Sequence, residues 1–194
     1  WDRPELDVVR VGGHPTNVVA VGSGSPAPGA WPALYEPFGV VKDAEDSDPS
    51  RRYKMGYLYL VRDYQGADAN PFHPAQFRGL GVAFSVDGCR WTTLPRAVTR
   101  ATCDGFTHWC RDPRTGRWLL FGRTKHIAPE LAARYGDLPG WRQHFWGRAV
   151  RRAESADFVA WTPDEGELCL APDLEDGPYG EVYGMRVFPY EGLF

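Results

Sequence analysis

Three carboxylate side chains recur at nearly the same position of a repeated hairpin in this chain of 194 residues. Aligning the hairpins by their turns matches Glu36 to Gly105, the neighbour of Asp104, and brings Glu181 opposite Gly105 as well. Carboxylates that converge repel one another, which raises the pKa of at least one and keeps a proton on it near neutral pH. Cleavage of a glycosidic bond needs such a pair, one protonated acid and one ionised carboxylate. We therefore predict that Glu36, Asp104 and Glu181 are catalytic, against the alternative of coincidence among 25 Asp and Glu.

Cationic and aromatic residues lie in or beside two long loops, at about 63–78 and 124–144. Long loops at one end of a rigid scaffold commonly carry binding residues. Each of these side chains alone is more often a solvated surface residue, so the prediction rests on their convergence. The predicted substrate-binding residues are Arg62, His73, Arg123, His126, Trp141, Arg142 and His144.

The elements that must hold these residues are repeated. The motif Ser-x-Asp-(Gly/Phe)-x-x-Trp occurs at 85–91 and 155–161, so its tryptophans are 70 residues apart. Apolar stretches and turn signals predict hairpins over 38–61 and 107–121 and the start of a third at 184–188. Each unit reads as four antiparallel strands, which is the unit of a β-propeller. We expect an all-β fold, an incomplete β-propeller of four-stranded antiparallel blades.

The repeat sets the expected boundaries within one partial domain. Residues 1–21 are the tail of a preceding blade, 33–91 and 104–161 are blades, and 181–194 begin the next. Five blades of this size need about 350 residues, so we expect a fragment with little activity of its own. One helical turn is the most that 129–135 is expected to form.

Strand direction separates structural residues from functional ones. The turns at 43–50 and 112–116 and both Ser-x-Asp turns fall at one end, and the long loops and the three carboxylates at the other. Asp112 is therefore expected to begin a tight turn, although Arg111-Asp112-Pro113 is similar to a motif of some sugar hydrolases. Asp87 and Asp157 are expected to cap their own turns. Trp91 and Trp161 are expected to pack between blades.

Four segments together resemble bacterial proteins assigned to the five-bladed propeller glycoside hydrolases, which are similar to glycoside hydrolase families 32 and 43: Arg52–Met55, Ser85–Trp91, Glu154–Trp161 and Glu181–Met185. The resemblance implies that three carboxylates stand at the starts of innermost strands. By position, Glu181 resembles the general acid and Asp104 the supporting aspartate. Glu36 is a weaker match, because the family's first carboxylate usually belongs to the first blade. The resemblance implies a bacterial enzyme of carbohydrate metabolism that favours furanose-type substrates.

Other functions remain open. The Ser-x-Asp motif is near the turn motif of sialidases, which need several arginines and a tyrosine nucleophile; Arg62, Arg123 and Arg142 could supply the arginines. A phosphorylase would need a phosphate pocket. A non-catalytic carbohydrate-binding or scaffold propeller could use Trp141, Trp146 and Tyr64 as stacking platforms.

Net charge and composition limit the classes of partner that the chain is expected to bind. A formal net charge of −3 argues against nucleic acid, which calls for a basic face. The longest apolar run, residues 55–61, is far shorter than the roughly 20 residues that span a bilayer. Four cysteines show no metal-ligand spacing, so no cofactor is expected, and a structural metal on the propeller axis stays open. The expected partner is a carbohydrate. The oligomeric state, the disulfides, and a cytoplasmic as against an extracellular or periplasmic location stay open.

Overall fold

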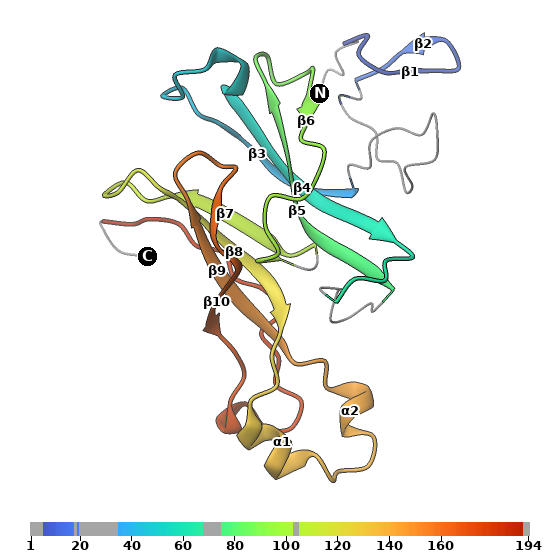
Figure 1. Ribbon diagram of the computed structural model, residues 1–194, viewed down its shortest axis with the longest axis vertical. Coiled ribbons are helices and arrows are strands. Elements are labelled where there is room, and N and C mark those ends of the chain that lie inside the picture. Colours follow the sequence, from blue (N-terminus) through green and yellow to red (C-terminus); the bar gives the residue numbers. More distant parts are fainter. Residues whose placement is uncertain (1–5, 18, 20–34, 68–74, 103–104, 192–194) are drawn as a thin grey trace.

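The computed structural model describes residues 6–17, 19, 35–67, 75–102 and 105–191, and they form two four-stranded antiparallel sheets (Figure 1). The first sheet has the order β3 (Tyr35–Lys42), β4 (Tyr53–Arg62), β5 (Gln76–Ser85) and β6 (Thr92–Thr93). The second has the order β7 (Thr107–Arg111), β8 (Trp118–Lys125), β9 (Arg148–Ser155) and β10 (Trp161–Leu170). In both sheets neighbours in sequence are neighbours in space. The predictions of an all-β fold and of four-stranded antiparallel units are confirmed.

Short elements complete the fold. A separate two-stranded ribbon of β1 (Arg10–Val11) and β2 (His14–Pro15) precedes the first sheet in the chain (Figure 1). The loop between β8 and β9 forms α1 (Pro129–Tyr135) and α2 (Trp141–His144), at the end of the molecule away from the first sheet. The 3-10 turns η1 (Pro49–Arg51) and η2 (Leu174–Asp176) follow β3 and β10. The single turn expected over 129–135 is thus a seven-residue helix, and α2 was not expected.

Strands β7, β8 and β9 of the second sheet have apolar contacts on both faces, whereas β10 is largely exposed after Trp161. Because successive side chains of a strand point to opposite sides, each strand supplies two sets of apolar contacts. One face meets Leu80 and Val82 of the first sheet through a cluster that includes Trp109, Trp118, Leu120, Ala153, Phe158 and Trp161. The other face carries Leu119, Phe121 and Val150, which pack against Val182, Met185 and Val187 of the chain after β10. Strands β7, β8 and β9 therefore form the middle of three packed layers.

Residues 184–188, the predicted first strand of a third hairpin, contain no strand, and the predicted second strand at 193–194 lies outside the described residues. The main chain here crosses the second sheet instead of pairing along it. The N–H of Val182 donates to the carbonyl of Arg148 in β9 at 3.1 Å, and the carbonyl of Val187 is 2.7 Å from a ring nitrogen of His108 in β7. Between these two contacts, the partly buried side chain of Met185 packs against the sheet. Side-chain packing against the second sheet, not strand pairing, therefore holds the segment 182–187.

The two Ser-x-Asp turns have matching hydrogen bonds, as predicted. The Asp87 carboxylate accepts from the Ser85 hydroxyl at 3.0 Å and from two following backbone N–H groups, each at 2.8 Å. The Asp157 carboxylate accepts from the Ser155 hydroxyl at 3.0 Å and from two backbone N–H groups at 2.9 and 2.7 Å. The backbone N–H groups of Arg90 and Cys89 hold the pKa of Asp87 far below its ordinary value. Both aspartates thus cap their own turns.

The tight turn between β7 and β8 also forms as expected. Asp112 accepts from the N–H of Arg114 at 2.9 Å and from the hydroxyl of Thr115 at 3.0 Å, and these contacts lower its pKa. Gly116 closes the turn with φ of +69°, and its N–H donates to the Asp112 carbonyl at 2.8 Å. Asp112 therefore begins a turn at the end of β7 opposite to the candidate site described below.

Buried ion pairs join the two sheets at this same end. The Lys54 side chain in β4 is 1% exposed, and its Nζ lies 2.9 Å from Asp43 Oδ2 and 2.7 Å from Asp46 Oδ2. The second carboxylate oxygen of Asp43, Oδ1, lies 3.3 Å from Nη1 of Arg111 in β7. Asp43 therefore links a lysine of the first sheet to an arginine of the second.

Candidate functional site

Glu181 lies at the end of the second sheet where β7 and β9 begin and β8 ends. Its Oε1 accepts a hydrogen bond from the backbone N–H of Trp146 at 2.6 Å, and its Oε2 forms an ion pair with the guanidinium of Arg148. The Glu181 side chain is 15% exposed. Both carboxylate oxygens are thus held by the chain that enters β9, and the group still has access to solvent.

Aromatic rings and guanidinium groups form a continuous series of contacts beside Glu181. The guanidinium carbon of Arg148 is 5.0 Å from the Trp146 ring and 5.1 Å from the Tyr183 ring. Tyr183 meets Phe106 edge to face with ring centroids 5.3 Å apart, and Arg186 lies 5.3 Å from the Phe106 ring. We call these five residues, Trp146, Arg148, Tyr183, Phe106 and Arg186, the arginine–aromatic row. Cation–π contacts of this kind orient long side chains that would otherwise be free to move.

Arg123 supports the row from within the second sheet. It lies near the end of β8, where its Cα is paired with Val150 of β9. Its side chain is buried, and its guanidinium carbon is 4.4 Å from the Tyr183 ring. The sheet thus fixes Arg123 below Tyr183, while the crossing segment 181–187 brings Glu181 and Tyr183 over the strand ends.

Gly147 makes the sharp entry into β9 that this arrangement needs. It has φ of +66°, and a Cβ there would lie 2.6 Å from the Ile127 side chain and 2.8 Å from the His126 carbonyl oxygen. The N–H of His126 donates to the Gly147 carbonyl at 2.7 Å. The close approach of these two backbone segments places Trp146 and Arg148 on either side of the turn, where both contact Glu181.

Of the residues predicted from the sequence, the structure brings Glu181 and Arg123 into one cluster around Tyr183. Asp104 and His73 lie outside the described residues. Glu36 belongs to β3, but its side chain is also outside the description. The convergence of three carboxylates thus stays a prediction, and Glu181 is the one of the three whose side-chain contacts are described.

The other predicted binding residues lie elsewhere. Arg62 is exposed at the end of β4 in the first sheet, and His126 is half-buried beside Gly147. Arg142 and His144 are exposed on α2. Tyr64, an expected stacking platform, packs with its ring centroid 5.4 Å from that of Phe77.

The expectation that Trp141 binds substrate needs correction. Its side chain is 0% exposed, and its ring stacks on Phe145 with centroids 4.9 Å apart. With Leu131 and Ala128 it forms the small core of the helical loop, and its indole N–H donates to the carbonyl of Pro178. Two short helices need an apolar residue to pack around, and Trp141 is that residue. It has no ring face available to a ligand.

Sequence reasoning missed most of the row: Phe106, Arg148, Tyr183 and Arg186, together with His108. One signal was present, because Arg78 and Arg148 each stand seven residues before the serine of a Ser-x-Asp turn. The other residues carry no such signal, since their roles arise only when the segment after β10 crosses the second sheet. The sialidase-like alternative needs several arginines and a tyrosine nucleophile, and the structure has Tyr183 beside Arg123 and Arg148.

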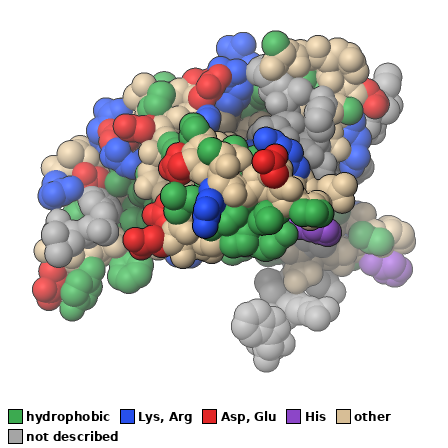
Figure 2. Space-filling model, turned by 90° about the horizontal axis from the view of Figure 1, so that it is seen from below, with side chains coloured by type: hydrophobic (Ala, Val, Ile, Leu, Met, Phe, Trp, Pro, Cys, Tyr) green, Lys and Arg blue, Asp and Glu red, His purple; other side chains and the backbone are tan. Residues whose placement is uncertain are grey.

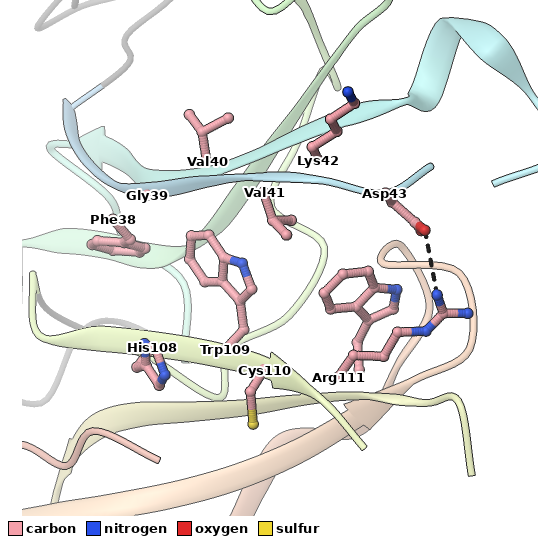
Figure 3. A pocket seen from close by; sticks show the side chains of 11 residues that line it. Phe38, Gly39, Val40, Val41, Lys42, Asp43, His108, Trp109, Cys110 and Arg111 are labelled. Carbon is pink, nitrogen blue, oxygen red and sulfur yellow. Dashed lines mark hydrogen bonds and ion pairs between the residues drawn. The ribbon is translucent and has the colours of Figure 1, made fainter. Parts of the chain in front are cut away.

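A groove of about 470 Å³ lies between β3 and β7 (Figure 3). Phe38 and Val41 of the first sheet face Trp109 of the second across it, and the Asp43–Arg111 ion pair closes one end. His108 lies at the other end and is also in contact with the crossing segment. The groove is thus mainly apolar and adjoins the candidate site through His108.

The surface seen from the helical end carries charges of both signs, and hydrophobic side chains gather between them in continuous patches (Figure 2). Within the described ranges no group of three or more His, Cys, Asp or Glu side chains is placed to hold a metal ion. No helix in these ranges is long and apolar enough to cross a membrane. Cys89, Cys110 and Cys169 are free thiols, and Cys103 lies outside the described residues.

Comparison of the chain with models of protein families, with curated proteins and with solved structures found no match. A proposal for its function therefore rests on the chain's own residues.

Proposed function

We propose that this chain belongs to a β-propeller glycoside hydrolase that cleaves a glycosidic bond with carboxylate side chains. The observation that carries the proposal is the placement of Glu181, a partly exposed carboxylate held by Arg148 and by the N–H of Trp146 beside exposed aromatic rings. Sugar rings pack against aromatic faces, and glycosidases act through carboxyl groups. A site that contains both is suited to bind a saccharide and to act on it.

The propeller interpretation is supported by the way the layers stack. Two four-stranded meanders with the same turn chemistry pack face to face, and the segment 181–187 covers the free face of the second. In a propeller every blade is covered on both faces by its neighbours. On this interpretation the strands β3 and β7, which are edge strands of their sheets, face the axis.

The proposed chemistry assigns different tasks to the carboxyl groups. An ion pair with arginine is an interaction of an ionised carboxylate, whereas a general acid must be protonated. Glu181 in its contact with Arg148 is therefore suited to act as base, nucleophile or orienting group. The general-acid role that the family resemblance implies for Glu181 would require substrate to displace Arg148. Asp104, which stands three residues before β7, and Glu36 are the proposed partners.

Hydrolysis by the full-length gene product tests this proposal. The substrates are furanosides and pyranosides with a chromogenic leaving group, and polysaccharides assayed by reducing-sugar release. Glu181→Gln is expected to lower kcat by a factor on the order of 10² to 10⁴. Glu167→Gln, at an exposed position of β10, is the matched control and is expected to keep wild-type turnover. Wild-type hydrolysis that Glu181→Gln leaves unchanged would refute the assignment.

A non-catalytic carbohydrate-binding protein is the second candidate. Trp146 and Tyr183 keep 43% and 55% of their surface exposed, which favours stacking on a sugar whether or not a bond is cleaved. The two functions differ in one outcome. A binding protein would bind saccharides on a glycan array and hydrolyse none of them. Trp146→Ala would weaken this binding, and Glu181→Gln would have no hydrolytic activity to lower.

A further inference from the structure

Arg186 differs from the other arginines near Glu181 in its partners. It is exposed, and its guanidinium is held against the Phe106 ring at 5.3 Å and 3.3 Å from Nδ1 of His108. Among the residues that the structure describes, no carboxylate forms an ion pair with Arg186. Arg148, in contrast, is paired with Glu181. Arg186 is thus a positioned cation whose charge no described acid neutralises.

His108 is in the protonation state needed to hold Arg186 in place. Its Nε2 is 2.7 Å from the carbonyl oxygen of Val187, which can only accept, so Nε2 carries the proton. In a neutral ring Nδ1 then has a lone pair, which accepts from the guanidinium Nη1 of Arg186. Burial lowers the pKa of His108, and the charge of Arg186 lowers it further, which agrees with a neutral ring. The histidine therefore orients the arginine without cancelling its charge.

The row connects this cation to Glu181. Arg186 contacts Phe106, Phe106 contacts Tyr183, and Tyr183 contacts Arg148, which pairs with Glu181. A saccharide that lies along the exposed rings of this row would meet the Glu181 carboxylate at one end and the Arg186 guanidinium at the other. Guanidinium groups bind carboxylate and phosphate oxygens through paired N–H donors.

We propose that the site takes an anionic saccharide, one that bears a carboxylate or a phosphate, and that Arg186 binds the anionic group. This inference rests on the proposed carbohydrate function and adds to it the charge of the substrate. Arg186 sets specificity in this scheme, since it would attract the charged sugar and would leave neutral sugars with one contact fewer. Carboxylate and phosphate share this chemistry, and the experiment separates them.

Calorimetric titration of the full-length protein tests the inference. The probes are a galacturonic acid trisaccharide, the corresponding neutral galactose trisaccharide, and a galactose phosphate. The charged probe is expected to bind at least about tenfold more tightly than the neutral one, the difference that one charge-assisted hydrogen-bonded pair commonly makes. Arg186→Gln should remove this preference for the charged probe, and Arg186→Lys should keep part of it. Arg96→Gln, which also replaces an exposed arginine, should change nothing.

Each outcome distinguishes this inference from the function on which it rests. Preference for the uronate identifies a carboxylated sugar, and preference for the phosphate identifies a sugar phosphate; both support the inference if Arg186→Gln abolishes them. Equal affinity for charged and neutral probes overturns the inference and leaves the carbohydrate function standing. A preference that survives Arg186→Gln overturns the role of Arg186. Absence of binding to every probe, in a protein that hydrolyses neutral glycosides, overturns the anionic substrate alone.

Discussion

Phe158 stands in the second Ser-x-Asp turn at the position that Gly88 occupies in the first, and both residues have a left-handed backbone, with φ of +67° and +79°. This conformation directs the next two N–H groups onto the aspartate of each turn. It is unfavourable for a residue with a Cβ, by roughly 1 kcal/mol or more. Phe158 offsets this cost because its fully buried ring contacts three tryptophans, Trp109, Trp118 and Trp161.

Removal of the Phe158 ring should therefore destabilise the junction between the two sheets. We expect Phe158→Ala to lower the free energy of unfolding by about 3 to 5 kcal/mol, since it leaves a cavity among the tryptophans and keeps the backbone strain. Denaturation in guanidinium chloride measures the change. Val86→Ala, at an exposed position of the first turn, is the control and should cost less than about 0.5 kcal/mol. A Phe158 variant as stable as this control would show that the ring does not hold the sheets together.

The buried Lys54 should make the Asp43 link between the sheets costly to break. Asp43→Ala leaves a 1% exposed ammonium group with one carboxylate fewer and removes a partner of Arg111. We expect a loss of about 3 kcal/mol in unfolding free energy, near the low end for a broken buried pair because Asp46 still contacts Lys54. Glu45→Ala removes the exposed partner of Arg111 and should cost less than about 1 kcal/mol. Equal effects of the two variants would contradict the role given to burial.

Stability should fall on acidification because the capping aspartates have lowered pKa values. Burial alone would raise the pKa of Asp157, but the N–H groups of Ala160 and Val159 and the hydroxyl of Ser155 outweigh it and bring the pKa below its ordinary value. A carboxylate of this kind stabilises the folded state above its unfolded pKa, and the contribution is lost as the pH falls through the folded pKa. We expect the unfolding free energy to decrease below about pH 4 and Asp157→Asn to flatten this decrease. An unchanged pH profile in Asp157→Asn, measured by denaturant titration, would argue against the cap.

Substitution should affect mainly stability at Trp141 and mainly saccharide binding at Trp146. Trp141→Ala empties the core of the helical loop and should cost about 3 to 5 kcal/mol of stability. Trp146→Ala removes a partly exposed ring that contacts Arg148, so we expect a loss of less than about 1 kcal/mol and weaker saccharide binding. Thermal unfolding and glycan binding separate the two effects. If Trp146→Ala kept full saccharide binding, the exposed ring would not be a stacking surface.

Local chemistry allowed much of this fold to be predicted. The turn at 112–116 and both Ser-x-Asp turns depend on side chains that bond to backbone groups two or three residues away, and such contacts can be read from spacing. The burial of Trp141 depends on how two short helices pack, which its sequence neighbours do not specify. The contact between His108 and Arg186 joins residues 78 apart and exists only because the segment after β10 crosses the sheet. Of the site, Glu181 and Arg123 could be named in advance, and the side chains that hold them could not.

We propose that acidic side chains converge on one end of the stacked sheets to cleave a glycosidic bond. A crystal structure of the full-length protein with a bound saccharide tests it most directly, through the distance between the carboxyl groups of Asp104 and Glu181. We predict a separation of roughly 5 to 10 Å, with both groups facing the scissile bond. Carboxyl groups that point apart, or a saccharide bound away from Glu181, would contradict the proposed catalytic site.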